Sequence, residues 1–287
     1  MTRSQLPNPA RGKNLGKTES RLLKDIVIVL LTIAPIALVY LLPPDTSFAE
    51  VQSAGTLTAC VPSNFPPLAM PQAKDPGFDI ALLQEITRRL GISLTLNVNP
   101  LIGRDFNPRN WGITRAGCQV VAGGIAVTPT TRSFLETIST GIETGWAVIQ
   151  KTDAPLKKGA RIGVYPGYGG LDRVSLSKLL RQHGVAVTLV SSAEALAQGL
   201  DDGTFDAAVS ESLSVRNLLE VHPAWSVAWL PDALDRASLG LGLWKGDLTL
   251  KARIVDAFNA MASEGFVRNL ATHYDIVPIE KTAVFAD

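Results

Sequence analysis

The feature that most constrains the fold of this chain is a regular alternation of strand-like and helix-like segments, which starts near residue 56 and starts again after residue 150. The first series reads TLTACV, then the amphipathic segment FDIALLQEITRRL, then ISLTLNV with alternating apolar residues. The second series reads ARIGVY, a helix near 171–182, VAVTLV, SAEALAQGLDDG and FDAAVS. Because strands that alternate with helices form parallel sheets covered by helices, two such series predict two α/β lobes.

The composition is that of a folded chain without a basic domain. Of the 287 residues, 46% are hydrophobic and 18% are charged, which fits a folded core. The net charge of +1 argues against a dedicated nucleic-acid-binding protein. The sequence contains neither Cys-x-x-Cys-His nor a Cys/His cluster, and its three histidines lie far apart. We therefore expect no metal or other cofactor, and a binding protein rather than an enzyme.

The N-terminal region combines a basic tail with an uncharged apolar run. Residues 1–25 are rich in Lys and Arg, and residues 26–42 read IVIVLLTIAPIALVYLL. As a helix this run rises about 26 Å, near the lower limit for crossing a bilayer. Basic residues on its N-terminal side predict that this end is cytoplasmic and that the rest of the chain lies outside. Residues 43–53 have the composition of a linker.

A second interpretation of this region is a secretory signal that is cleaved after Ala49, where small residues precede the bond. We favour the uncleaved anchor, because the basic tail and the apolar run are both long for a signal. Both interpretations place residues 50–287 across the membrane.

The two cysteines, Cys60 and Cys118, belong to different predicted strands. Cys60 is late in TLTACV, whereas Cys118 begins CQVVAGG. If the two strands run parallel side by side, the cysteines are offset by several residues, which disfavours a disulfide. We expect two buried thiols.

Several segments, taken in order, resemble the family 3 extracytoplasmic solute-binding proteins of amino-acid ABC transporters. They are AGTLTACVPSNFPPLAM followed by GFDIALLQEITRRLG, then AGGIAVTPTTR, GARIGVYPGYGG, GTFDAAVSE and the segment that begins SLGLGLW. The resemblance covers residues 54 to about 275 and implies the type II periplasmic-binding-protein fold, in which two α/β lobes joined by a two-strand hinge close on a ligand. It implies that residues 54–146 and 240–287 form lobe 1 and that residues 147–239 form lobe 2.

The resemblance also implies a set of ligand-binding positions, which are Phe65, Thr128, Arg132, Gly167, Tyr168 and Glu211. An amino-acid ligand needs a cation and amide donors for its carboxylate and an acid for its ammonium group. Arg132 is the candidate cation for a bidentate pair. It lies one residue beyond the family's arginine position, which here is Thr131. Glu211 stands at the position of the family's ammonium-binding acid.

The other implied positions supply an aromatic ring, a hydroxyl and a glycine-rich turn. Phe65 would stack over the ligand, Thr128 would offer its hydroxyl and N–H, and Gly167 and Tyr168 precede a helix whose N–H groups suit an anion. Four of the six positions have a structural alternative. Phe65 could pack within its loop, Thr128 could cap the backbone, and Arg132 and Glu211 could be surface residues.

Two functions remain open at this stage. The first is an inner-membrane-anchored bacterial protein whose periplasmic part captures a small polar, anionic or zwitterionic solute by hinge closure, for an ABC permease. The second is a non-transport accessory subunit of a redox or photosynthetic membrane complex that retains the fold. The second is favoured by Thr131 in place of arginine and by ETISTGIETG, which lacks the family's proline and tyrosine.

Overall fold

The computed structural model of the chain describes residues 24, 26–34, 44–103, 107–167, 171–231, 234, 236–276 and 284–285. It divides into two units, Met1–Asp45 and Thr46–Asp287, and both sheets belong to the second unit. In the first unit residues 26–34 are helical, and residues 35–42 of the expected anchor lie outside the described residues. Within the described part of the chain, no helix is both long enough and apolar enough to span a membrane.

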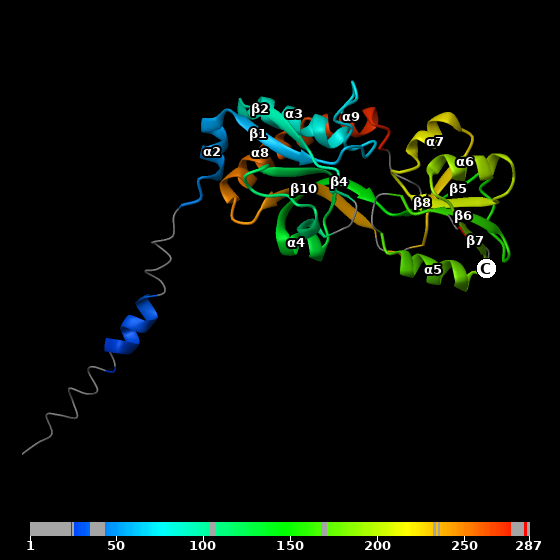
Figure 1. Cartoon of the computed structure of the whole chain (residues 1–287), viewed down its shortest axis with the longest axis horizontal. Helices are drawn as coiled ribbons and strands as arrows, with labels where there is room; N and C mark the ends of the chain where they lie inside the picture. Colours follow the sequence, from blue (N-terminus) through cyan, green and yellow to red (C-terminus); the bar gives the residue numbers. More distant parts are fainter. Residues whose placement is uncertain are drawn as a thin grey trace, which may run out of the picture. The chain divides into compact units, whose positions relative to one another are not determined.

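The first sheet has the strand order β2-β1-β3-β10-β4 (Figure 1). Its strands are β1 (Thr56–Val61), β2 (Ser93–Val98), β3 (Val120–Ala126), β4 (Leu135–Thr144) and β10 (Ala237–Trp244). Strand β1 runs parallel to β2 and β3, whereas β10 runs antiparallel to β3 and β4. The sheet is therefore mixed and not purely parallel as the sequence pattern predicted, because β10 runs opposite to β1, β2, β3 and β4.

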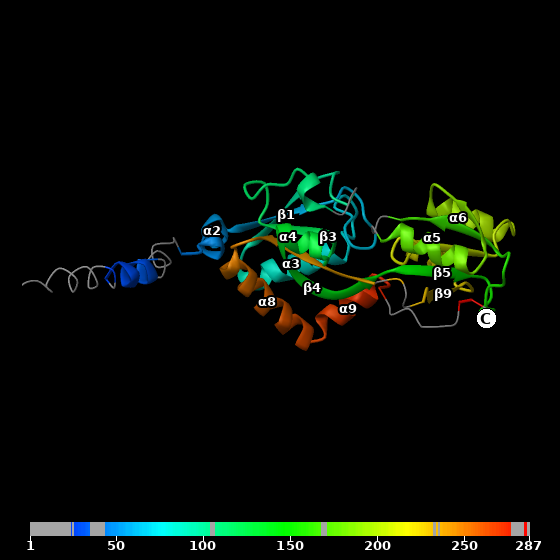
Figure 2. The same ribbon diagram turned by 90° about the horizontal axis from the view of Figure 1, so that it is seen from below.

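Three helices cover one face of the first sheet and share its core: α3 (Phe78–Leu90), α8 (Leu248–Ser263) and α9 (Phe266–His273). The apolar stripes of α3 and α8 explain this packing, since Phe78, Leu82, Ile86, Leu250 and Ile254 are fully buried. Figure 2 shows α8 and α9 following one another along this side of the sheet.

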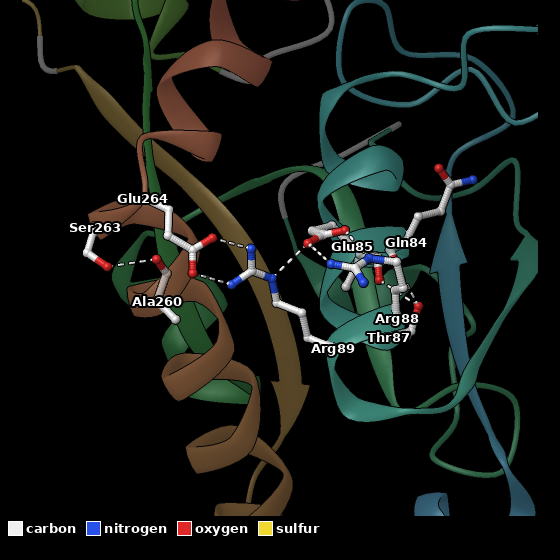
Figure 3. Close-up of polar contacts among 9 residues, drawn as sticks. Gln84, Glu85, Thr87, Arg88, Arg89, Ala260, Ser263 and Glu264 are labelled. Carbon is white, nitrogen blue, oxygen red and sulfur yellow. Dashed lines mark hydrogen bonds and ion pairs between the residues drawn. The ribbon is translucent and has the colours of Figure 1, made fainter.

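A bidentate ion pair joins α3 to α8. The Arg89 guanidinium donates to both Glu264 carboxylate oxygens, at 2.8 and 2.5 Å, and its Nε donates to Glu85 Oε1 at 2.7 Å (Figure 3). Glu85 also accepts from Arg88 within the same helix. Arg89 therefore connects two segments that are far apart in the sequence.

Part of the segment predicted as a linker is helical. Helix α2 (Ser47–Ala54) buries Val51 in the first core, and the Ser47 hydroxyl accepts the backbone N–H of Leu250 at 3.2 Å. The compact part of the chain therefore begins near residue 46.

The second sheet has the order β7-β6-β8-β5-β9. Its strands are β5 (Trp146–Gln150), β6 (Arg161–Tyr165), β7 (Ala186–Leu189), β8 (Ala207–Glu211) and β9 (Ser226–Trp229). Strand β6 runs parallel to β7 and β8, and β5 runs antiparallel to β8 and β9. Helix α5 (Arg173–Gln182) lies on the opposite side of this sheet from α6 (Ala193–Asp201) and α7 (Arg216–Val221) (Figure 1).

The described residues show the chain passing between the sheets three times. It leaves the first sheet at the end of β4 and enters the second with β5, one residue later, and it returns between β9 and β10. Near the C-terminus, Val284 is buried in the core of the second sheet, where its carbonyl accepts the N–H of Leu156 at 2.8 Å. The chain therefore forms two separate α/β sheets, as the two series of strands predicted.

The prediction of two free thiols is wrong, because Cys60 and Cys118 form a disulfide with a Cα–Cα distance of 5.6 Å. The predicted offset assumed that Cys118 continues an extended strand. Instead the chain turns there, since Gly117 and Cys118 both donate their N–H groups to the carbonyl of Thr114. The turn brings Cys118 back beside the end of β1.

Candidate ligand-binding site

The segment AGGIAV in β3 contains a bulge that only glycines can form. Gly123 and Gly124 have φ values of 94° and 82°, in the left-handed region that glycine adopts without strain. A Cβ atom on Gly124 would lie 2.0 Å from the Phe65 ring, and one on Gly123 would lie 2.4 Å from Pro62. The pairing of β3 with β10 shifts register at this point. The two glycines therefore bend β3 and let the Phe65 loop pack directly on its backbone.

A buried carboxylate holds this bulge. Oδ2 of Asp79, at the start of α3, accepts the N–H of Gly123 at 2.8 Å and that of Gly124 at 2.9 Å. Asp79 is 1% exposed, and burial raises its pKa to about 6, although the two N–H groups act in the opposite direction. Asp79 therefore satisfies two N–H groups that the bulge removes from the ladder of the sheet.

A cavity of about 320 Å³ lies next to the bulge, at the carboxyl ends of β1, β2 and β3. Its wall consists of residues at the end of β3 and in the segments that follow the three strands, namely Pro62, Ser63, Asn64, Phe65, Pro100, Ile102, Gly103, Trp111, Gly123, Gly124, Ile125, Ala126 and Thr131. Open α/β sheets bind ligands at this edge. Among the described lining residues none is charged, and Ser63, Asn64 and Thr131 supply the polar side chains. The cavity suits a small, uncharged group with apolar or aromatic surface.

The predicted cation and hydroxyl belong to helix α4 (Pro129–Phe134). Thr128 is its N-cap, and the Thr128 hydroxyl accepts the N–H of Thr131 at 3.2 Å. Thr131 is buried and lines the cavity, whereas Arg132 is exposed and does not line it. No described residue makes an ion pair or a hydrogen bond with the Arg132 side chain. The role of Arg132 in ligand binding stays a prediction.

The predicted acid has its partners within the chain. Glu211 ends β8 and is fully buried. Its Oε1 accepts the Thr144 hydroxyl and the Leu213 N–H, and its Oε2 accepts the N–H and the hydroxyl of Ser214. These four donors occupy the acceptor positions of the carboxylate. In this conformation Glu211 holds the turn after β8 against the end of β4.

The two predicted residues of the glycine-rich turn are only partly described. Gly167 has a φ of 64°, and a Cβ atom there would lie 2.5 Å from the Ser214 hydroxyl oxygen and 2.8 Å from Glu211. A glycine is required at this position because the turn packs on the segment that Glu211 organises. Tyr168 lies outside the described residues. The ligand-binding roles of both positions stay predictions.

The sequence interpretation missed several residues of the cavity. Trp111 lines the cavity although it is only 4% exposed. Ile102 follows β2 in a segment without a strong pattern, and the Cys60–Cys118 disulfide anchors the far end of that segment. Asp79, which holds the bulge beside the cavity, could have been found from the sequence. It lies in the first turn of an amphipathic helix, and an aspartate that is buried there needs hydrogen-bond donors from a neighbouring segment.

Comparisons with known proteins bear on the fold. The sequence matches no protein-family model and no curated protein. Solved structures do match. Tv2483 bound to L-arginine has a TM-score of 0.57 and 20% identity over 81% of this chain and 95% of its own length. An ancestral cationic amino acid solute-binding protein has a TM-score of 0.62 and 16% identity over 79% and 98%.

A third similar structure is an ABC uptake transporter substrate-binding protein from Streptococcus pneumoniae with bound histidine. Its TM-score is 0.57, with 17% identity over 83% of this chain and 99% of its own length. The fold is that of the two-lobed solute-binding proteins. At these identities the similarity establishes the fold and leaves the ligand to be argued from the site.

Among the residues that the structure describes, no group of three or more His, Cys, Asp or Glu side chains could hold a metal ion. What the described cavity offers is apolar contact and a few hydrogen-bonding groups.

Proposed function

We propose that this chain is a membrane-anchored extracytoplasmic solute-binding protein, which captures a small polar ligand between two lobes, one built on each sheet. The observation that carries the proposal is the cavity of about 320 Å³ at the carboxyl ends of β1, β2 and β3. It lies at the edge where this fold binds ligands, and the similar structures include proteins bound to arginine and histidine. The partner for delivery is an ABC permease in the bacterial inner membrane.

The walls of the cavity favour a ligand that places an uncharged group against Phe65 and Trp111. Both side chains are buried and offer aromatic surface, and Thr131 supplies a polar atom at the edge. The carboxylate of a zwitterionic ligand then faces Arg132, or the glycine-rich turn that contains Gly167. We infer amino acids with neutral side chains, or small organic anions, as the first candidates.

Calorimetric titration of residues 46–287 with a panel of amino acids and organic anions tests this function. We expect one or more neutral amino acids to bind, and Arg132→Ala to weaken binding at least about tenfold, because a carboxylate loses a bidentate partner. Arg268→Ala, which removes an exposed arginine from α9, is the matched control and is expected to bind normally. Absence of heat for the whole panel would refute ligand capture.

Anchoring to the inner membrane is the second part of the proposal. Ile26, Leu30 and Leu31 in the helical segment 26–34 are 51%, 60% and 70% exposed, a pattern typical of a segment that contacts lipid. The full chain is expected to remain in membranes after alkaline carbonate extraction, and residues 46–287 to be released. Release of both forms would contradict the anchor.

The second candidate function, an accessory subunit of a membrane complex, is favoured by two observations. Thr131 and not an arginine faces the cavity, and Glu211 is bound by four donors of its own chain. Purification of the full chain in mild detergent separates the candidates. Stable integral subunits that co-purify without an ABC permease support the accessory role.

A further inference from the structure

A second and larger cavity lies beside the second sheet, and its lining residues differ from those of the candidate ligand-binding site. Its volume is about 560 Å³, within the range of roughly 300–1,000 Å³ that small-molecule sites occupy. It lies between helix α5 and the edge strand β7, and Trp146, Val164, Leu176 and Leu180 line it with apolar surface. We call this cavity the α5–β7 groove.

The groove exists because α5 leaves β7 uncovered. Leu176 and Leu180 of α5 pack in the same core as Val148 and Val209 of the central strands, which draws the helix toward the middle of the sheet. All four residues of β7 are exposed. Two of these β7 residues, Val187 and Leu189, are apolar and line the groove, and Leu189 is 73% exposed. An apolar strip of this kind on an edge strand favours a partner with an apolar surface.

One side of the groove is cationic. Arg173, Ser177 and Arg181 lie four residues apart on α5, so they form one stripe along the helix, and all three line the groove. From Arg173 to Arg181 the helix rises about 12 Å. No described residue forms an ion pair or a hydrogen bond with either guanidinium group.

The acid that precedes this stripe in the sequence is used in capping the helix. The Asp172 carboxylate caps α5 by accepting the N–H groups of Val174 and Ser175, at 2.8 and 3.1 Å, and the Ser175 hydroxyl at 2.6 Å. Its acceptor capacity is largely used within the helix, which lowers its pKa. The groove therefore combines an apolar floor with two cations that are available to an anion.

We propose that the α5–β7 groove binds a linear amphiphilic carboxylate, with its hydrocarbon chain on the floor formed by Val164, Leu176 and Leu180 and its carboxylate paired with the arginines of α5. Charge complementarity selects this occupant. A neutral apolar molecule would leave the guanidinium groups without partners, and a small anion would leave the apolar floor in water. The Ser177 hydroxyl, between the two arginines, supplies a further donor.

Residues 46–287 are suitable for the test because both sheets and every described hydrophobic core lie within them. The unit is titrated with decanoate below its micellar concentration, and binding is followed by calorimetry and by amide chemical shifts. Decanol supplies the chain without the charge, and acetate supplies the charge without the chain. We expect decanoate to bind with shifts at residues 173–181 and 186–189, and both controls to bind at least about tenfold more weakly.

Two double variants of equal charge locate the site. Arg173→Ala/Arg181→Ala is expected to weaken decanoate binding at least about tenfold. Lys157→Ala/Lys178→Ala removes two exposed cations outside the groove and is expected to leave it unchanged. Equal affinity of the two double variants would overturn the proposal. Binding of decanol as tight as that of decanoate would also overturn it, and so would shifts confined to residues 62–65 and 123–126.

Discussion

The raised pKa of Asp79 predicts an unusual dependence of stability on pH. In the unfolded chain the aspartate has its ordinary pKa of 3.8, and in the folded chain burial raises it to about 6. Between these values the folded state binds more protons than the unfolded state, so stability falls as the pH rises. The difference of about two pH units corresponds to a loss of about 3 kcal/mol, since each pH unit contributes about 1.4 kcal/mol.

Asp79→Asn removes the titration while keeping the shape of the side chain. Its amide oxygen still accepts the N–H groups of Gly123 and Gly124, and its buried NH₂ group carries a cost that does not depend on pH. We therefore expect the free energy of unfolding of the wild type, minus that of the variant, to fall by about 2 kcal/mol between pH 4 and pH 7, most of the full difference. Contributions from other carboxylates occur in both proteins and cancel in the difference.

Urea denaturation of residues 46–287, followed by tryptophan fluorescence at half-unit intervals from pH 4 to pH 7.5, measures this difference. Asp153→Asn, at an exposed aspartate, serves as the matched control and should follow the wild-type profile in parallel. Parallel profiles for the wild type and Asp79→Asn would show that Asp79 titrates at its ordinary pKa. A difference that grows with pH would reverse the sign and refute the argument from burial.

Three further predictions concern stability. Gly124→Ala should destabilise the folded chain by at least about 2 kcal/mol more than Gly91→Ala. Both glycines have positive φ, but only a Cβ atom at residue 124 would lie 2.0 Å from an aromatic ring. Thermal unfolding of both variants measures the excess. Reduction of the disulfide between Cys60 and Cys118, which are 58 residues apart, should cost about 4 kcal/mol by loop entropy, and denaturation with and without reductant checks this. Arg89→Ala should lower the midpoint of urea denaturation, and by less at 1 M salt, because a partly exposed pair is screened.

Much of the fold followed from periodicity in the sequence. The predicted helix FDIALLQEITRRL coincides with α3, which Gly91 ends, and TLTACV coincides with β1, since each has the apolar period of its element. The mixed character of the sheets did not follow. Strands β5 and β10 have the same local pattern whether they run parallel or antiparallel to their neighbours, and only the passage of the chain between the sheets fixes their direction.

The disulfide shows a second limit of reasoning by strand register. The distance between two cysteines was judged as if every residue near Cys118 were extended. A single turn, in which Gly117 and Cys118 both bond to the carbonyl of Thr114, shortens the path to Cys60. Sequence patterns predict the interior of regular elements well, whereas the residues just before a strand depend on hydrogen bonds that no periodicity encodes.

The position of Arg132, the candidate cation for the ligand carboxylate, depends on the same distinction between extended and helical backbone. In an extended segment, the shift of one residue from Thr131 to Arg132 would turn the side chain to the opposite face. The segment is instead helical, because the Thr128 hydroxyl caps α4 through the N–H of Thr131. One residue then turns the side chain by about 100°, which places Thr131 at the cavity and moves Arg132 aside without turning it directly away.

Exchanging the two residues, Thr131→Arg with Arg132→Thr, would bring the guanidinium to the cavity edge. If ligand capture needs a cation there, the exchange should strengthen binding of an amino-acid carboxylate in calorimetry, and an unchanged affinity would show that the carboxylate is held elsewhere.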